Sequence, residues 1–363
     1  MFFGLAEFVS RGARTVIESI LVIRLRELGD TLLTTPLLRQ LRRLHPQARI
    51  NVLCQKTNHC ILEHNPHVDH TIVLSPRAPA HDFLAVSLGL RRQRYDMIVD
   101  VQSLPKTALI ARLTGGRERL GYHKRGWRNR LCYTRPYRPR KFEYAARQHL
   151  RLLQDERIDL DDVGLDFPVA PEMEAEADAF CRRYFRGPVA AIFPVCRFGY
   201  RDWARDKTAA VADRLANLGL QPWLVYGPGQ EDAARDIASR MQRKPVHKYT
   251  MPSFAMLRAI FARCELFFGN DGGPKHAAVA AGIPTVTVYR PEQAVAWAPT
   301  GNARHRVATT YCHPGAMSQA GTSTTAESIR DIPVAAVWKE ITAALRQRSA
   351  ATPFEAGRVT RAA

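Results

Sequence analysis

The stretch from residue 264 to residue 290 constrains the fold of this chain more than any other. Within it, residues 266–289, LFFGNDGGPKHAAVAAGIPTVTVY, predict a strand, a tight turn, a helix and a second strand. Gly272 and Gly273 let the backbone turn sharply and approach a ligand closely. Pro274 suits the first turn of a helix, and Gly282 suits its C-terminal end. Because a helix N-terminus after a strand attracts anions, this turn is a candidate diphosphate site.

The same alternation of short apolar runs and amphipathic segments continues along the chain. Further strands are predicted at 20–25, 49–54, 71–74, 96–101, 189–194 and 222–226. Helices are predicted at 31–44, 82–93, 106–113, 207–218, 231–241, 253–262 and 332–346, with irregular structure between residues 290 and 331. Strands that alternate with helices in this way indicate an α/β fold with parallel sheets built from βαβ units.

The length of 363 residues is enough for two domains. An acidic, proline-punctuated stretch from residue 155 to residue 171 is the best candidate for the linker. We therefore expect doubly wound, Rossmann-like domains whose strand ends face each other across a cleft. The predicted units are a helical extension at 1–19, the two domains at 20–165 and 166–346, and a flexible tail at 347–363.

The formal net charge of +19 favours anionic partners. Much of the excess lies in one segment, where only Glu118 and Glu143 oppose twelve cations: Arg117, Arg119, Lys124, Arg125, Arg128, Arg130, Arg135, Arg138, Arg140, Lys141, Arg147 and Arg151. A solvated basic face is one interpretation, and a nucleic-acid-binding surface is another. No helix-turn-helix, zinc-finger or RNA-binding motif accompanies these cations.

Hydropathy and cysteine usage predict a cytoplasmic protein. No run of 18 apolar residues is present, and the N-terminus lacks the features of a signal peptide. The seven cysteines have no metal-ligand spacing, so free thiols in a reducing compartment are expected. The apolar residues of 1–19 predict either a helix packed on the first domain or one lying on a membrane surface.

Two segments carry a resemblance to a known family. Residues 24–36, RLRELGDTLLTTP, resemble the N-terminal signature of the bacterial lipopolysaccharide heptosyltransferases, glycosyltransferase family nine. Residues 266–289 resemble the second signature of that family. Weaker landmarks are the segments 119–122, 193–194, 201–203 and 226–231. The resemblance implies a GT-B fold, in which the first domain binds the acceptor and the second binds the nucleotide sugar.

The resemblance also implies an activity. Such enzymes move a heptose from ADP-heptose to a hydroxyl of the growing lipopolysaccharide inner core, with inversion, and are not expected to need a metal or another cofactor. Inversion by single displacement requires one general base. Asp30 is the candidate, because it follows a buried strand and Gly29 at the predicted cleft edge. The competing interpretation of Asp30 is a helix N-cap.

The predicted donor site uses seven residues. By resemblance, Asp271 would lie near the sugar hydroxyls. Gly272 and Gly273 would offer N–H groups to the diphosphate, Lys275 would add charge, and His276 would lie beside them. The family usually has Ser or Thr where this chain has Gly272, so a hydroxyl contact is missing. By resemblance, Arg201 would pair with a phosphate and Glu231 would accept a hydrogen bond from a ribose hydroxyl. The competing roles are helix caps or first-turn residues for Asp271 and Glu231, packing for His276, and a surface arginine for Arg201.

The predicted acceptor site lies in the basic segment. An inner-core acceptor carries carboxylates, phosphates and a lipid anchor, so Arg119, Tyr122, Lys124, Arg125 and Arg128 are expected to bind it. This acceptor implies peripheral contact with the cytoplasmic face of the inner membrane. The alternatives are a GT-B transferase that uses another nucleotide sugar, a basic non-enzymatic nucleic-acid-binding protein, or a transferase inactivated by its altered 196–201 loop.

Overall fold

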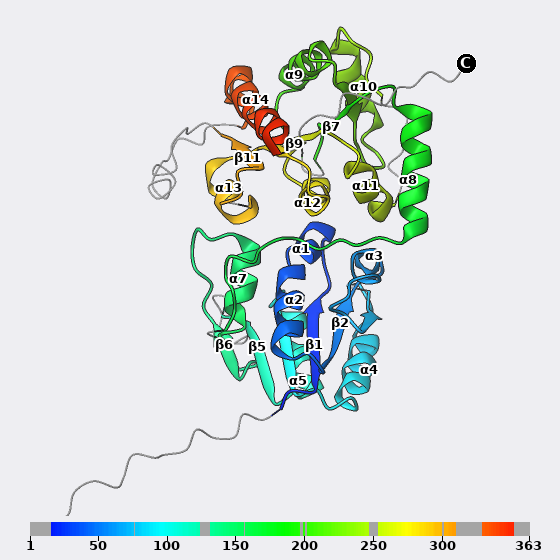
Figure 1. Ribbon diagram of the computed structural model, residues 1–363. Coiled ribbons are helices and arrows are strands. Elements are labelled where there is room, and N and C mark those ends of the chain that lie inside the picture. Colours follow the sequence, from blue (N-terminus) through cyan, green and yellow to red (C-terminus); the bar gives the residue numbers. More distant parts are fainter. Residues whose placement is uncertain are drawn as a thin grey trace, which may run out of the picture.

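Two parallel β-sheets, each covered by helices, lie one above the other in the computed structural model (Figure 1). The structure describes residues 16–75, 77–123, 131–155, 157–196, 199, 202–246, 253–299, 301–309 and 329–351. The predicted extension up to residue 15 and the tail from residue 352 lie outside this part of the chain. Within it, no helix is long and apolar enough to cross a membrane.

The first sheet has six parallel strands in the order β3-β2-β1-β4-β5-β6. They are β1 (Ser19–Arg24), β2 (Arg49–Cys54), β3 (His70–Val73), β4 (Met97–Asp100), β5 (Glu118–Tyr122) and β6 (Arg135–Tyr137). The connecting helices are α1 (Leu28–Leu32), α2 (Thr35–Leu44), η1 (Lys56–Asn58), α3 (His59–Leu62), α4 (Ala80–Arg91), α5 (Pro105–Thr114) and α7 (Ala145–Leu152).

Helices cover both faces of this sheet, because its strands are apolar on both sides. In β1, Ile20 and Val22 join the core that contains α2 and α7. Leu21 and Ile23 point the other way, into a core built with α4 and α5. The predicted doubly wound architecture is therefore confirmed for the first domain.

The second sheet has five parallel strands in the order β11-β10-β9-β7-β8. They are β7 (Val189–Phe193), β8 (Gln221–Leu224), β9 (Leu266–Asn270), β10 (Thr285–Val288) and β11 (His305–Ala308). Its helices are α8 (Pro171–Tyr184), α9 (Arg205–Asn217), α10 (Glu231–Arg240), α11 (Phe254–Phe261), α12 (Gly273–Ala280), α13 (Pro291–Trp297), η4 (Ile329–Asp331) and α14 (Val334–Ala351).

The strand order of each sheet reverses at one position, between β1 and β4 in the first sheet and between β7 and β9 in the second. Chain segments that leave such neighbouring strands diverge, which opens a crevice at their carboxyl ends. The loops after β1 and β9 therefore begin at the two crevices. These loops contain Asp30 and Asp271.

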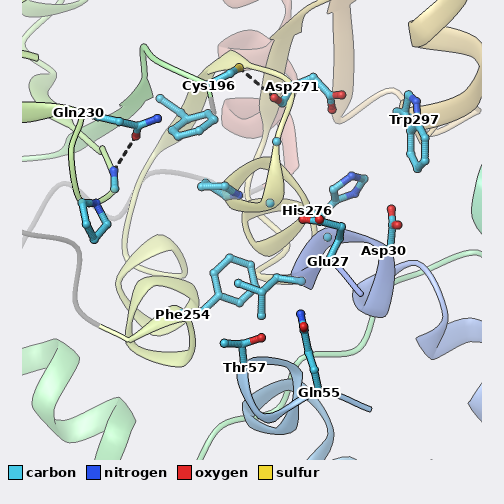
Figure 2. Close-up of a pocket in the computed structure, with 18 residues that line it drawn as sticks. Glu27, Asp30, Gln55, Thr57, Cys196, Gln230, Phe254, Asp271, His276 and Trp297 are labelled. Atoms are coloured by element: carbon cyan, nitrogen blue, oxygen red, sulfur yellow. Dashed lines mark hydrogen bonds between the residues drawn. The ribbon is translucent and has the colours of Figure 1, made fainter. Parts of the chain in front are cut away.

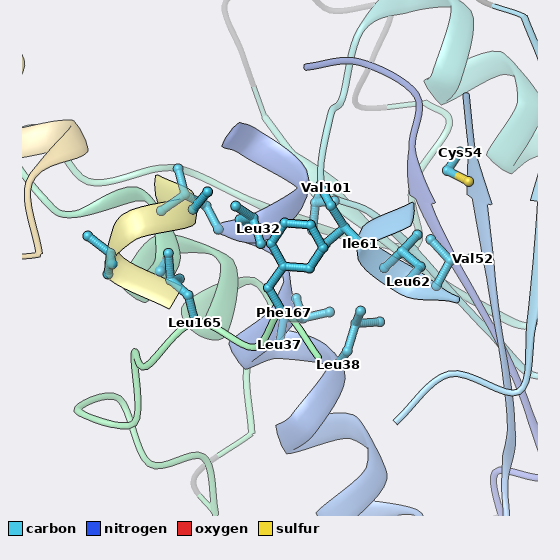
Figure 3. Packing of buried hydrophobic residues seen from close by; sticks show 14 of the residues in the cluster. Leu32, Leu37, Leu38, Val52, Cys54, Ile61, Leu62, Val101, Leu165 and Phe167 are labelled. Atoms are coloured by element: carbon cyan, nitrogen blue, oxygen red, sulfur yellow. The ribbon is translucent and has the colours of Figure 1, made fainter. Parts of the chain in front are cut away.

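An extended segment from residue 153 to residue 170 joins the two domains (Figure 1). It contains the predicted domain boundary and is anchored by a buried aromatic side chain. Figure 3 shows Phe167 among Leu32, Leu37 and Ile61 of the first domain. On its other side, the Phe167 ring lies 5.5 Å from the ring of Phe254 in α11. The linker thus takes part in one core shared by both domains.

Arg39 of α2 also fixes the linker, by ion pairs with Asp162 and Asp166. We expect Arg39→Met to lower the free energy of unfolding by about 2 kcal/mol, because these are hydrogen-bonded, largely buried charges. The urea unfolding midpoint measures this. Arg43→Met is the matched control: Arg43 pairs with the same Asp162 but is 60% exposed, so we expect a change below about 0.5 kcal/mol. Equal losses of unfolding free energy in the two variants would contradict the role of Arg39 in fixing the linker.

Three predicted elements differ from the structure. The single helix at 31–44 is divided into α1 and α2, because Pro36 cannot donate a backbone hydrogen bond to the Leu32 carbonyl, which instead accepts from the Thr35 hydroxyl. The stretch from 290 to 331 is not irregular throughout, since α13 and β11 lie within it. The closing helix α14 runs past the predicted end at residue 346.

Candidate active site

A pocket of about 790 Å³ lies between the two domains (Figure 2). Its walls come from the loops after strands of both sheets and from α11, α12 and α13. The lining residues are Glu27, Leu28, Gly29, Asp30, Gln55, Thr57, Phe193, Cys196, Gly227, Pro228, Gln230, Phe254, Asp271, Gly272, Gly273, Pro274, His276 and Trp297. The first-domain aspartate and the second-domain glycine turn therefore share one crevice, as the sequence predicts.

The turn after β1 is held in an unusual backbone conformation. The side-chain oxygen of Gln102, beyond the end of β4, accepts hydrogen bonds from the backbone N–H groups of Leu25 and Arg26 at 2.8 and 3.1 Å. The next residue, Glu27, has φ of 60° although it is not a glycine, and it forms the N-cap of α1. Such backbone strain persists only where surrounding contacts impose it. This turn sets the direction in which α1 enters the pocket.

Asp30 lies in the first turn of α1, and its carboxylate contacts Arg24. The two side chains form an ion pair of 2.8 Å, with Arg24 8% and Asp30 28% exposed. Arg24 also donates to the Val101 carbonyl, so this cation is fixed by the sheet. The N-cap interpretation of Asp30 is wrong, because Glu27 occupies that position. Arg24 belongs to the N-terminal signature, but its contact with Asp30 is not visible in the sequence.

Gly29 brings the two domains into direct contact. A Cβ atom on Gly29 would lie 2.8 Å from Cδ2 of His276 and 3.4 Å from the Cα of Gly273. Cβ atoms in proteins essentially never lie as close as 2.8 Å to a non-bonded atom. A glycine is therefore needed here for α1 to pack against α12.

The second-domain side of the pocket begins with Asp271 at the end of β9. The Tyr289 hydroxyl donates to Oδ1 of Asp271 at 2.8 Å, and the Cys196 thiol donates to its backbone carbonyl at 3.0 Å. Gly272 is the N-cap of α12, so Asp271 is not the cap of this helix. Asp271 is nearly buried but lines the pocket. The hydrogen bond from Tyr289 thus holds the Asp271 carboxylate in a fixed orientation beside the pocket.

Gly272 and Gly273 form the turn into α12, with Pro274 in its first turn. A Cβ atom on Gly272 would lie 2.9 Å from the ring of Phe193. The buried Phe193 ring therefore fills the space that a serine or threonine side chain would need. A serine or threonine at this position would therefore require the Phe193 ring to shift. The start of α12 still offers an N-terminal dipole to an anion in the pocket.

Lys275 does not face the pocket. Its side chain is 1% exposed, and Nζ donates to the Trp297 carbonyl at 2.6 Å and lies 3.7 Å from Oδ1 of Asp271. This placement argues against the prediction that Lys275 adds its charge to the diphosphate site. The helical periodicity of α12 turns this side chain towards α13, a helix within the stretch that the sequence predicts to be irregular. Burial lowers the pKa of Lys275 to about 8.

His276 lines the pocket although its ring is almost completely buried. Nδ1 lies 3.2 Å from Nζ of Lys275. Burial, together with the charge of Lys275, holds the pKa of His276 well below its usual value. The imidazole is therefore neutral at physiological pH and can donate one hydrogen bond.

Glu231, a predicted donor residue, is not among the residues that line the pocket. Glu231 is the first residue of α10, as expected for a first-turn acid, but its predecessor Gln230 lines the pocket instead. The Gln230 oxygen accepts from the Gly227 backbone N–H at 2.8 Å, which holds this side chain against the turn after β8. Arg201 lies outside the described residues, so its predicted phosphate contact remains a prediction.

A second pocket of about 270 Å³ adjoins the first. Asp30 and Trp297 line both pockets. The remaining lining residues belong to the first domain: Arg24, Val101, Tyr122, Pro139, Ala145, Gln148 and His149. No sequence signal singled out Trp297, because the segment around it was predicted to be irregular.

The predicted acceptor residues differ in their placement. Tyr122 lines the second pocket, and its hydroxyl lies 2.7 Å from Nδ1 of His149. Arg119 lines neither of these two pockets and instead donates to the carbonyls of Gly116 and Cys132. The acceptor role of Arg119 therefore stays a prediction. Lys124, Arg125 and Arg128 lie outside the described residues.

Comparison with known proteins gives consistent matches over most of the chain. The sequence profile of glycosyltransferase family 9 (heptosyltransferase) matches residues 84–323. Lipopolysaccharide heptosyltransferase 3 of Escherichia coli is 28% identical over 296 residues, which covers 76% of this chain and 84% of that protein.

Solved structures show the same two-domain GT-B fold. A glycosyl transferase family 9 protein from Veillonella parvula DSM 2008 superposes with a TM-score of 0.81 at 22% identity, covering 91% of this chain and 98% of that one. The E. coli heptosyltransferase WaaC with ADP superposes with a TM-score of 0.64 at 19% identity, covering 92% and 98%. The predicted fold is confirmed.

Proposed function

The chain belongs to glycosyltransferase family 9 (heptosyltransferase), and we propose that it transfers a heptose from ADP-heptose to a hydroxyl of a lipopolysaccharide inner-core acceptor. The observation that carries this proposal is the single pocket in which Asp30 faces the glycine turn at Asp271–Gly273. Asp30 can accept a proton, and the glycine turn can hold a diphosphate. Family membership favours this activity over the nucleic-acid-binding alternative.

The proposed reaction is a single displacement. The acceptor oxygen forms a bond to the anomeric carbon of the heptose while the bond from that carbon to the phosphate oxygen breaks. The proton of the acceptor hydroxyl passes to the Asp30 carboxylate, and ADP leaves with the bonding electrons. Because only one base takes part and no covalent enzyme intermediate forms, the anomeric configuration inverts.

The donor is proposed to lie in the larger pocket. The diphosphate would occupy the turn at Gly272 and Gly273, where the dipole of α12 stabilises the charge of the leaving group. The neutral His276 would donate a hydrogen bond to the donor, and Asp271 would accept from its sugar hydroxyls. We place the nucleoside towards Gly227 and Gln230, the pocket residues contributed by the loop after β8.

The acceptor is proposed to enter through the second pocket. Asp30 lines both pockets, so a hydroxyl arriving from the side of Tyr122 and His149 would meet the carboxylate next to the donor. Arg24 would keep that carboxylate oriented. Holding both reactants at one base in this way supplies the proximity that a displacement requires.

A thermal-shift screen with ADP, UDP, GDP and their sugars tests the donor. We expect stabilisation by ADP compounds only, of about 2.7 kcal/mol at a ligand concentration of about 100 times Kd. ADP-heptose and an inner-core acceptor should then yield product. Stabilisation by UDP or GDP compounds instead would support the alternative of a GT-B transferase with another donor. Stabilisation without product would support the inactive-transferase alternative.

We also propose that α4 and α5 rest on an anionic membrane surface, where a lipid-anchored acceptor would be found. Leu84 and Leu88 of α4 are 49% and 47% exposed, and Leu109 of α5 is 51% exposed. The helices lie side by side, since Nζ of Lys106 is 3.3 Å from the Phe83 ring centroid. The exposed cations of this face complement acidic lipid headgroups: Arg91, Arg92, Lys106 and Arg112.

Co-sedimentation with phosphatidylglycerol vesicles tests this surface. We expect the triple variant Leu84→Ser, Leu88→Ser, Leu109→Ser to lose about tenfold in vesicle affinity, because three apolar insertions are removed. Leu218→Ser is the matched control, since Leu218 is 56% exposed but lies in the second domain. Unchanged binding of the triple variant would place any membrane contact elsewhere.

A further inference from the structure

Lys275 is a buried cation directly behind the proposed donor pocket. Its ammonium group donates to the Trp297 carbonyl at 2.6 Å, lies 3.2 Å from Nδ1 of His276 and lies 3.7 Å from Oδ1 of Asp271. All three contacted residues line the pocket, although Lys275 does not. Burying an ammonium group costs desolvation free energy unless partners compensate the charge. A role in the adjacent pocket would explain why a lysine is found at this buried position.

The contact with His276 selects one tautomer of the imidazole. An ammonium group has only donors, so Nδ1 of His276 must act as the acceptor. Since the ring is neutral, its proton is then on Nε2. Nε2 lies 3.6 Å from the position that a Cβ atom would take on Gly29, on the side where the two domains meet. The donor N–H of His276 is thus directed to the interface that contains the pocket.

The contact with Trp297 fixes the junction of the two pockets. Trp297 is the last residue of α13, where backbone carbonyls attract a cation. Trp297 lines both pockets, and its indole lies across from Asp30 (Figure 2). An aromatic ring at this point can pack against a sugar face. The hydrogen bond from Lys275 therefore links the position of this ring to the donor turn.

We propose that Lys275 is a positioning residue, which fixes the Nε2–H tautomer of His276 towards the donor and holds Trp297 at the junction where donor and acceptor meet. This inference rests on the proposed function of the pocket. Lys275 does not touch the substrates. It acts on them through His276, Trp297 and Asp271. Its charge lies too deep to serve as a phosphate ligand.

Lys275→Met tests the proposal, because methionine has a similar length without charge or donor. We expect kcat to fall about tenfold while the Kd of ADP changes less than about threefold, since alignment is lost but the glycine turn remains. Lys244→Met, which removes an exposed lysine of the same domain, should leave both unchanged. Circular dichroism and thermal unfolding establish that the variant folds.

Long-range ¹H–¹⁵N NMR of the histidine rings supplies a readout that does not depend on transfer. In the wild type, His276 should show an unprotonated Nδ1 and a protonated Nε2, assigned with His276→Gln. In Lys275→Met this pattern should change to a mixture of tautomers. An unchanged pattern together with an unchanged kcat would overturn the proposal, whereas a changed pattern in a protein that binds no ADP-sugar would overturn only the proposed function.

The pH profile gives a second readout. The groups that face Lys275 are Asp271 and Tyr289, which directly follow β9 and β10, His276 of α12 and His305 of β11. Burial lowers the pKa of Lys275 to about 8, so the cation is present below this pH and is lost as the pH rises through it. We expect wild-type kcat to decline above pH 8 and Lys275→Met to lack this limb. An identical limb in both proteins would contradict the positioning role.

Discussion

Asp30→Asn is expected to lower kcat by about three orders of magnitude while leaving the Kd of ADP within about twofold of wild type. Asparagine keeps the shape of the side chain and can still contact Arg24, but it cannot take the acceptor proton. The donor turn lies in the other domain and is unchanged. Steady-state transfer kinetics and calorimetry with ADP measure the two effects.

Glu27→Gln is the matched control for Asp30→Asn. Glu27 carries the other first-domain carboxylate that lines the larger pocket, and it lies three residues before Asp30. We expect its variant to retain kcat within about tenfold, because the second pocket adjoins Asp30 and not Glu27. If Glu27→Gln lost transfer and Asp30→Asn retained it, the base would be Glu27. Equal loss of transfer and ADP affinity in Asp30→Asn would indicate a structural role.

Gly29→Ala is expected to lower kcat about 100-fold without a comparable loss of stability. The added methyl group would lie 2.8 Å from the buried ring of His276, so α1 must move away from α12. Asp30 is the next residue and would move with α1, away from the donor. Displacements of about 1 Å have effects of this size when reactants must be aligned.

Gly89→Ala is the control for this substitution. Gly89 lies in α4 of the same domain, and a Cβ atom there would meet nothing within 4 Å. Alanine should raise the stability of this helix slightly and leave kcat unchanged. Wild-type kcat in Gly29→Ala would show that the domains do not need the observed contact during transfer. A large loss of stability would instead indicate that the contact supports folding.

The donor turn illustrates how far the sequence predicts the site. The pattern of an apolar run, Asp271, two glycines and a helix is local, so the strand, turn and helix could be read from it. The side chain of Lys275 could not be placed in the same way. The direction of this side chain depends on α13. The apolar residues of α13 have no regular spacing that would predict a helix, and the helix packs on a sheet formed by segments distant in the sequence. For the same reason, the sequence pattern favours Glu231 as a donor contact, whereas in the structure Gln230 lines the pocket.

The sequence by itself determined the alternation of strands and helices, the two-domain division and the positions of Asp30 and the glycine turn after their strands. These features depend on local backbone preferences and on the periodicity of apolar residues. Only the tertiary structure decided that Arg24 contacts Asp30, that Phe193 fills the space beside Gly272, and that Trp297 lies at the junction of two pockets. Such contacts join residues far apart in the chain, and packing, not local pattern, fixes which side chains meet.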